Sequence, residues 1–250
     1  DTIAPLAALL REEVLESLQA NRRNAKATGR EENSYPFIGL KRDWRASLYP
    51  NATDEEFADG FAQTVVFALV IALSDGMDFN NVQLRDIAEG LQSKHSLLGR
   101  SLDLLTEHIK GSTVGLVLET IIRTLSATDW RAISGGNQDV YLHLYEHFLN
   151  TYDPALRKKS GSYYTPTEVV AAMTRPTDQA LQKYLSIPEG LSADSVAVID
   201  PAMATGTYGL SIVQHVAAQA EKYGPGAVAD AVTSVANRLY GIELQSGPFS

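Results

Sequence analysis

The spacing of apolar residues predicts that the first 150 residues are almost entirely helical. Residues 3–20 carry leucine and valine at helical intervals, with glutamates on the opposite side. A longer helix is expected from Thr53 to about Leu73, because the three acidic residues after Thr53 complement the helix dipole. Its apolar positions nearly encircle the later turns, which predicts burial at the centre of a helical bundle. Further helical patterns cover about 82–92, 95–109, 113–126 and 138–150.

One segment of this region, residues 21–51, shows no sustained periodicity. It mixes basic side chains with aromatic residues and prolines, and we expect a long loop or a partly ordered arm. Basic residues dotted with aromatics are able to contact nucleic acid. A solvated connector with a few anchoring aromatics is the interpretation that we favour.

The pattern changes in the last 100 residues. Thr165 or Thr167 is expected to cap a helix, with Pro166 at an early helical position. Beyond that helix the pattern predicts a strand, two helices and a second strand, at about 196–200, 207–222, 227–237 and 239–243. Two strands joined through helices predict a parallel pair with a right-handed crossover.

Composition narrows the class of protein. With 250 residues, 44% of them hydrophobic, the chain is long enough to bury a sizeable core. It contains no cysteine, which excludes disulfides and cysteine-ligated zinc. The longest apolar run, Phe67 to Leu73, is too short to cross a bilayer, and the N-terminus lacks a signal-peptide pattern. We therefore expect a cytoplasmic protein without a membrane partner.

Charge argues against a non-specific polyanion binder, because the formal net charge is −9. The acidity lies mostly in residues 1–150, which hold 14 basic and 21 acidic residues, against 7 and 9 in residues 151–250. We expect residues 1–150 to form a helical domain and residues 151–250 to begin an α/β domain. The chain starts without methionine and stops just after a predicted strand, so we expect it to be part of a longer protein.

One short pattern suggests a metal site. His143-Leu-Tyr-Glu-His147 matches H-x-x-E-H, in which two histidines share one face of a helix. No third ligand is apparent nearby, and the aromatic residues around it are typical of a packing helix. We therefore expect no metal site.

The turn after the first predicted strand is the strongest candidate for a ligand site. It reads Asp200-Pro-Ala-Met-Ala-Thr-Gly-Thr-Tyr208, and ligands of open α/β sheets bind at the carboxyl ends of the strands. No lysine follows Gly206, as a triphosphate loop requires, and the glycine pattern of a dinucleotide site is missing. S-adenosylmethionine fits, because its cationic sulfonium and amino groups tolerate neighbouring carboxylates.

Two acidic residues end the two predicted strands. Asp200 is expected near the methionine part of the cofactor, and Glu243 is expected to accept hydrogen bonds from the ribose hydroxyls. Hydrogen bonds to a charged acceptor contribute roughly 1.5–3 kcal/mol each. Either acid alone is also explained as an ordinary strand-end residue, whereas the two together favour a site.

Three motifs in this order resemble those of the γ-class adenine-specific DNA methyltransferases. They are Tyr163-Tyr-Thr-Pro166, Asp200 to Tyr208 and Gly241-Ile-Glu243. The lead-in from Tyr145 to Gly161 is similar to that of type I, single-chain type I-like (ISP) and type IIG restriction–modification enzymes. The resemblance covers about residues 140–250 well and the helical part only loosely.

The resemblance implies a Rossmann-like S-adenosylmethionine-dependent methyltransferase domain with a truncated parallel sheet, and a role for each matching residue. Tyr164, Thr165 and Pro166 would wall the methionine end of the cofactor. Asp200, Pro201, Ala202 and Gly206 would form the loop after the first strand, and Glu243 would hold the ribose. Ala204 departs from the pattern, because many members of the family have glycine there.

The motif that holds the flipped target adenine, Asn/Asp-Pro-Pro-Tyr/Phe, does not occur in these 250 residues. We therefore expect no catalytic residue within the chain and no methyl transfer by the chain alone. The partners implied are double-stranded DNA and other domains or subunits of a restriction–modification enzyme. A non-catalytic module that binds cofactor, couples domains or contacts DNA in a larger DNA-processing protein is the alternative, and methylation of RNA or protein is a weaker one.

Overall fold

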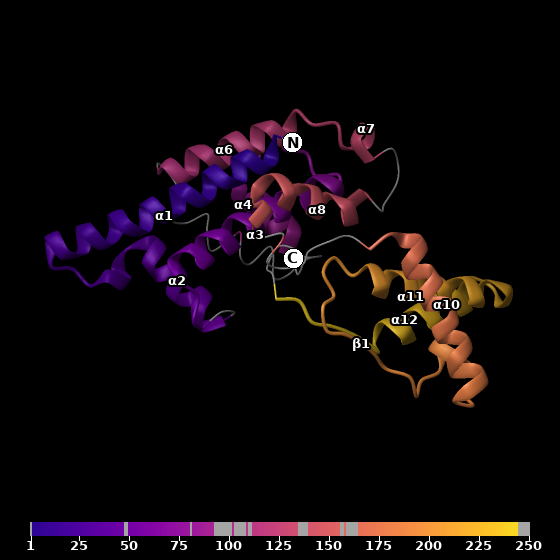
Figure 1. Cartoon of the computed structure of the whole chain (residues 1–250). Coiled ribbons are helices and arrows are strands. Elements are labelled where there is room, and N and C mark those ends of the chain that lie inside the picture. The colour runs from indigo at the N-terminus through magenta and orange to yellow at the C-terminus, as the bar shows by residue number, and fades with distance from the viewer. Residues whose placement is uncertain are drawn as a thin grey trace. The chain divides into compact units, whose positions relative to one another are not determined.

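The computed structural model of the protein describes residues 2–47, 50–80, 82–92, 112–134, 140–155 and 165–244, together with Leu102, Ile109 and Lys158 (Figure 1). The expected helix at 95–109 lies almost entirely outside these residues. The chain divides into two compact units, which are described separately. The first consists mainly of residues 1–140 and 147–156, and the second of residues 141–146 and 157–249.

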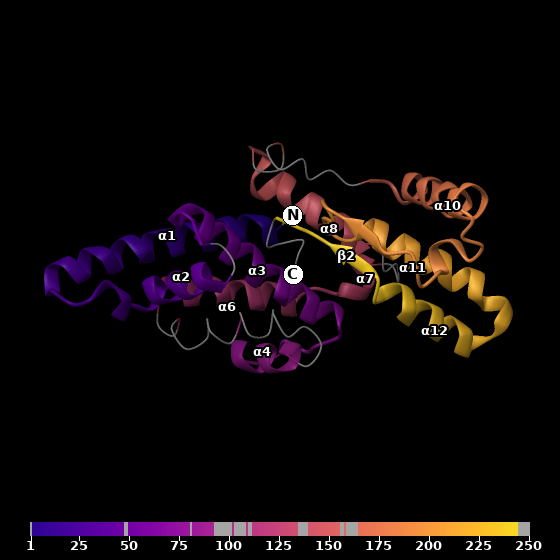
Figure 2. The same cartoon turned by 90° about the horizontal axis from the view of Figure 1, so that it is seen from below.

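The first unit is built from helices, as the periodicity predicts (Figure 2). Its described helices are α1 (Ile3–Thr28), η1 (Glu32–Ser34), α2 (Pro36–Ser47), α3 (Asp54–Ser74), α4 (Leu84–Gln92), α6 (Thr113–Ser126), α7 (Trp130–Ser134) and the end of α8 (Val140–Tyr152), whose residues 141–146 belong to the second unit. The expected stripe on α1 is confirmed, because Leu10, Val14 and Leu18 are fully buried.

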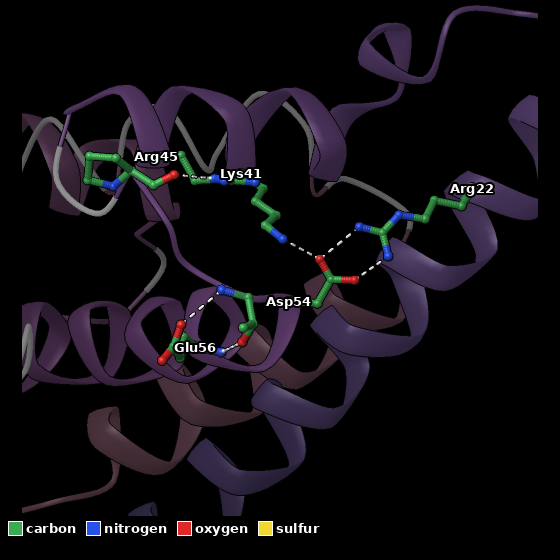
Figure 3. Close-up of polar contacts among 7 residues, drawn as sticks. Arg22, Lys41, Arg45, Asp54 and Glu56 are labelled. Carbon is green, nitrogen blue, oxygen red and sulfur yellow. Dashed lines mark hydrogen bonds and ion pairs between the residues drawn. The ribbon is translucent and has the colours of Figure 1, made fainter.

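Helix α3 forms the centre of this unit. Every residue from Gly60 to Ala72 is buried, which confirms the prediction from its encircling apolar pattern. Thr53 begins the helix with a capping box, in which its hydroxyl accepts from the Glu56 N–H at 3.1 Å and the Glu56 carboxylate accepts from the Thr53 N–H at 2.9 Å (Figure 3). By length and composition α3 would be able to cross a membrane, yet 83% of its apolar window is buried inside the protein. Such burial is typical of a core helix.

The expectation of a loop over residues 21–51 is wrong. Helix α1 continues through Thr28 and ends at Gly29, which adopts the left-handed conformation (φ 66°), and α2 covers Pro36–Ser47. In α2 the side chains of Phe37 and Trp44 are buried, and the Trp44 ring lies edge-on to Phe57 of α3 at 5.8 Å. Aromatic packing therefore holds α2 in place, although its run of periodically spaced apolar residues is too short to predict a helix.

Ion pairs also help to hold residues 21–51 in helices where a loop was expected. Asp54, the first residue of α3, accepts hydrogen bonds from the Arg22 guanidinium of α1 and the Lys41 ammonium of α2 (Figure 3). The Arg22 hydrogen bond is the main cause of a lowered pKa of Asp54; burial opposes it and Lys41 reinforces it. Two of the basic side chains of the segment are thus bound to a carboxylate of the same unit.

The second unit combines helices with two short strands. Its elements are α10 (Thr167–Tyr184), η2 (Gly190–Ser192), β1 (Val198–Asp200), α11 (Thr207–Ala220), η3 (Glu221–Tyr223), α12 (Pro225–Ala236) and β2 (Leu239–Gly241). The strands are parallel, with Val198 opposite Leu239 and Asp200 opposite Gly241. The predicted order of strand, two helices and parallel strand is confirmed, although each strand is shorter than expected.

Helices α11 and α12 supply the core of this unit. Ile212, Val216 and Val235 are buried together with Leu191, and Val198 and Leu239 of the strands pack against them. The alternate strand residues Ile199 and Tyr240 stand opposite one another and are 66% and 56% exposed. One face of the strand pair is therefore covered, and the other carries exposed apolar side chains.

Candidate cofactor site

The turn between β1 and α11 forms the candidate site. Gly206 precedes the first residue of α11 with a left-handed backbone (φ 79°, ψ 21°), which glycine adopts at little cost. Its N–H donates to the Met203 carbonyl at 2.8 Å, and its carbonyl accepts from the Leu210 N–H at 2.9 Å. A Cβ on Gly206 would meet no atom within 4 Å, so the backbone conformation, and not crowding, accounts for the glycine.

Asp200 ends β1 and holds the start of this turn. Its Oδ1 atom accepts from the Ala202 N–H at 3.1 Å, and its carbonyl accepts from the Ile242 N–H at 2.9 Å. Pro201 and Ala202 are exposed, and the residues from Met203 to Gly209 are half-buried. The turn is thus accessible to a ligand while its backbone is fixed at both ends.

Glu243 reaches the same turn from the other strand. Its Oε2 atom accepts from the Ala204 N–H at 2.7 Å, across 39 residues of sequence. The two acids that the sequence singles out at two strand ends therefore meet on one loop. This places Asp200, Pro201, Ala202, Gly206 and Glu243 together at the carboxyl edge of the strand pair.

Ala204 has a left-handed backbone, with φ at 47°. A residue with a Cβ adopts this conformation only when its surroundings hold it there. The position where the sequence departs from the resemblance is thus one where glycine would be less strained.

The helix that follows Thr165 and Pro166 joins the site further along its length. Pro166, and neither Thr165 nor Thr167, occupies the N-cap position of α10, so the expected threonine cap is wrong. Near the start of α11, two contacts join it to α10: the Tyr208 hydroxyl lies 3.0 Å from Met173 Sδ, and the hydroxyls of Ser211 and Thr174 are 3.2 Å apart. Thr165 and Pro166 are not brought onto the turn by these bonds. Tyr163 and Tyr164 lie outside the described residues.

Sequence reasoning missed a buried carboxylate on the helix that follows Pro166. Asp178 of α10 is 3% exposed. Its Oδ1 accepts from the Leu191 N–H at 2.7 Å, and its Oδ2 accepts from Gln219 Nε2 at 2.8 Å and His215 Nε2 at 3.0 Å. Burial would raise the pKa of Asp178, but the hydrogen bonds from His215, Leu191 and Gln219 outweigh it and lower that pKa. Asp178 therefore ties α10 to η2 and α11 as a carboxylate.

A signal for Asp178 was present in the sequence. It follows Val170 and Thr174 at intervals of four, and all three are buried on one stripe of α10. An acid on a buried stripe requires partners, because an unpaired buried charge is costly. Its partners lie up to 41 residues away, so their identity does not follow from the local pattern.

The structure does not test the histidine pattern of α8 as a metal site. His147 is exposed, and the side chains of His143 and Glu146 lie outside the described residues. Within the part of the chain that the structure describes, no group of three or more His, Asp or Glu side chains is placed to hold a metal ion.

Comparison with protein families finds a match over the last part of the chain. Residues 136–250 match the family model "N-6 DNA Methylase". This part of the chain is therefore similar to the N-6 DNA methylases. The matched segment contains α8 and the whole candidate site, from Thr165 to Glu243. It leaves α1 to α7 of the helical unit outside the match.

Solved structures share the fold over a longer stretch than the family match. The structure titled "cryoEM structure DrdV-DNA complex" aligns with a TM-score of 0.60 and 18% identity, covering 99% of this chain and 23% of that one. The "ATP-dependent Type ISP restriction-modification enzyme LlaBIII bound to DNA" aligns with a TM-score of 0.53 and 15% identity, covering 98% and 16%. The chain thus spans less than a quarter of either structure. No curated protein is a significant match to it.

Proposed function

We propose that the protein is part of a DNA methyltransferase of a restriction–modification enzyme. The enzyme transfers a methyl group from S-adenosylmethionine to the exocyclic amino group of adenine in DNA. One observation carries the proposal: within the segment that matches the N-6 DNA methylase family model, carboxylates from the ends of two parallel strands meet on one accessible turn. The two DNA-bound structures that share the fold support DNA as the partner.

The cofactor is matched to the turn by charge and by the exposure of the turn. Asp200 lies where the cationic methionine part of S-adenosylmethionine would be stabilised, and Glu243 supplies the acceptor for the ribose hydroxyls. The exposed turn residues Pro201 and Ala202, together with Gly206, leave the backbone open to a close approach. In this proposal the strand pair begins a Rossmann-like sheet.

The remaining contacts to the cofactor come from the residues before α10. Tyr164, Thr165 and Pro166 wall its methionine end. Asp178 and Thr174 hold α10 against α11, so they fix the helix that carries this wall relative to the helix that follows the turn.

The two parts of the chain have different roles in this proposal. Residues 1–150 form a helical domain that braces the catalytic domain and contacts DNA or neighbouring domains, and residues 151–250 hold the cofactor. The enzyme acts on DNA in the cytoplasm. The target-adenine motif is not among these 250 residues, so the chain alone does not transfer methyl groups.

Calorimetric titration with S-adenosylmethionine tests the cofactor site. The chain is expected to bind, and Glu243→Ala is expected to weaken binding on the order of 10- to 100-fold, because a hydrogen bond to a charged acceptor contributes about 1.5–3 kcal/mol. Asp200→Ala is expected to weaken binding in the same direction. Asp230→Ala, which removes an exposed acid from α12, is the matched control and should leave affinity unchanged. Equal affinity of all four proteins would reject the site.

A second candidate is a non-catalytic module whose cofactor pocket serves assembly or sensing. The observation that favours it is the missing target-adenine motif. The sequence of the whole gene separates the two candidates. An Asn-Pro-Pro-Tyr motif after Glu243, together with methyl transfer by the whole protein, supports the enzyme, and its absence supports the module.

A further inference from the structure

We propose that Met203 and Gly241 are positioning residues for the cofactor loop. The Met203 side chain, seated over Gly241, holds the Ala204 amide against the Glu243 carboxylate before a cofactor arrives. Glu243 then has two tasks, since it fixes the loop and also receives the ribose. This inference rests on the proposed cofactor site and extends it to residues that do not themselves touch the ligand.

The backbone of the loop continues the pairing of the strands. Beyond the last paired residues, the Ile242 N–H donates to the Asp200 carbonyl at 2.9 Å, and the Met203 N–H donates to the Ile242 carbonyl at 3.0 Å. Met203 is therefore fastened to the segment after β2 by its own backbone. The next residue, Ala204, is brought directly in front of Glu243.

Gly241 makes room for the Met203 side chain. A Cβ at position 241 would collide with Met203 Sδ and would lie 3.0 Å from its Cγ and 3.2 Å from its Cβ. Gly241 does not have a positive φ, so space, and not backbone freedom, requires a glycine here. The thioether of Met203 packs against the backbone of Gly241. The loop therefore approaches β2 more closely than any larger residue at position 241 would permit.

The contact between the Met203 side chain and Gly241, which we call the seat, positions the Ala204 amide. Its left-handed backbone (φ 47°) is unfavourable for alanine, and the 2.7 Å hydrogen bond to Glu243 Oε2 holds it there. A carboxylate accepts about four hydrogen bonds, so an acid that already binds the Ala204 amide is still able to receive a ribose hydroxyl. Because the loop is ordered beforehand, cofactor binding does not have to order it.

A Gly241→Ala variant tests the seat by cofactor affinity. The added methyl group displaces Met203, and S-adenosylmethionine is expected to bind about tenfold or more weakly in calorimetry. Gly226→Ala is the matched control, because a Cβ in this first turn of α12 meets nothing within 4 Å, and its affinity should be unchanged. Circular dichroism and the melting temperature show that each variant is folded.

A double-mutant cycle tests whether Met203 is the partner of that methyl group. Met203→Ala alone is expected to weaken binding, but it should suppress most of the additional loss caused by Gly241→Ala, because the colliding side chain is gone. Contacting residues give such non-additive effects. Effects that simply add would show that the two residues act independently, and would overturn the seat.

The amide resonance of Ala204 provides a readout that general destabilisation does not imitate. In ¹⁵N–¹H spectra without cofactor, loss of its hydrogen bond to the carboxylate should move this resonance upfield in Glu243→Ala and in Gly241→Ala, but not in Gly226→Ala. An unmoved resonance in Gly241→Ala, or affinity equal to that of the unaltered chain, overturns the proposal. If the unaltered chain binds no cofactor, the proposed function fails, and the amide resonance still decides whether the seat exists.

Discussion

Tyr152 shows how a single hydroxyl satisfies a buried charge in the helical unit. It donates to Asp59 Oδ1 at 2.7 Å, and Gln63 Nε2 donates to Asp59 Oδ2 at 3.0 Å. Arg11 lies 3.9 Å from Asp59, with its guanidinium 5.1 Å from the centre of the Tyr152 ring. Burial raises the pKa of Asp59 more than the bonds from Tyr152, Gln63 and Arg11 lower it. Burial and the neighbouring Asp59 likewise raise the pKa of Tyr152.

Tyr152→Phe should therefore destabilise the helical unit. It leaves a mostly buried carboxylate with one donor fewer, which costs about 1–3 kcal/mol. Tyr35→Phe removes a hydroxyl that is bonded only at the surface, to Thr28, and should change stability by no more than about 0.5 kcal/mol. Urea unfolding followed by circular dichroism measures both, and equal effects would contradict this account of Asp59.

The candidate site also shows what single residues reveal in a sequence. Asp200, Gly206 and Glu243 were found from their places at predicted strand ends and in the turn, and they do lie together. The bond from the Ala204 amide to Glu243 was not predictable, because every residue except proline carries a backbone N–H and side-chain patterns do not show which one is used. The roles of these residues toward a cofactor remain predictions.

At the scale of elements, η2 approaches α10 closely at Gly190. Gly190 has a left-handed backbone (φ 57°), and a Cβ there would collide with Asp178 Oδ1 and lie 2.9 Å from both Asp178 Cγ and Gln182 Nε2. Glycine is needed at this position for two reasons, its backbone conformation and its lack of a side chain.

Gly190→Ala should accordingly destabilise the second unit more than the replacement of a glycine that is required for its backbone conformation alone. Gly206→Ala is the comparison, because its φ is also left-handed but its Cβ has open space. A left-handed alanine costs about 1–2 kcal/mol, and Gly190→Ala adds the displacement of a buried carboxylate. Denaturant unfolding of the two variants compares them directly, and a loss in Gly190→Ala no larger than in Gly206→Ala would remove the steric role of Asp178.

Elements were predictable where one apolar period continues through a whole helix. This is why α3, α11 and both strands were expected in the right order. The helix at Pro36–Ser47 was not expected, because it is fixed by Trp44 against Phe57 and by Lys41 on Asp54. Those contacts connect separate parts of the sequence and leave no local periodicity.

At the scale of the whole molecule, each unit contains a carboxylate whose pKa is lowered, Asp54 in the first and Asp178 in the second. A carboxylate with a folded pKa below its unfolded value of about 3.9 stabilises the folded state above that value. This stabilisation is lost as pH falls through the folded pKa. Asp59 acts in the opposite sense, because its raised folded pKa makes its contribution largest at low pH and lost as pH rises through that value.

Stability should therefore fall as pH is lowered from about 4, and Asp178→Asn should reduce this dependence. The variant keeps an oxygen that accepts from the Leu191 amide but has no charge to lose on acidification. Melting temperatures measured between pH 6 and 2.5 test this, with Asp230→Asn on the exposed side of α12 as the control. A pH dependence that is identical in all three proteins would show that Asp178 does not contribute.

The all-round burial of α3 has a consequence for synthesis on the ribosome. Among the described helices it is the one that is long and apolar enough to cross a membrane, so before it packs it would attract chaperones or membrane-insertion machinery at the ribosomal exit tunnel. Helix α1 is translated before it and already offers the stripe of Leu10, Val14 and Leu18 against which it packs. Helix α6, a second neighbour, follows about 50 residues later, which at 5–20 residues per second is a delay of only a few seconds. The order of the helices along the chain thus limits how long this segment is exposed.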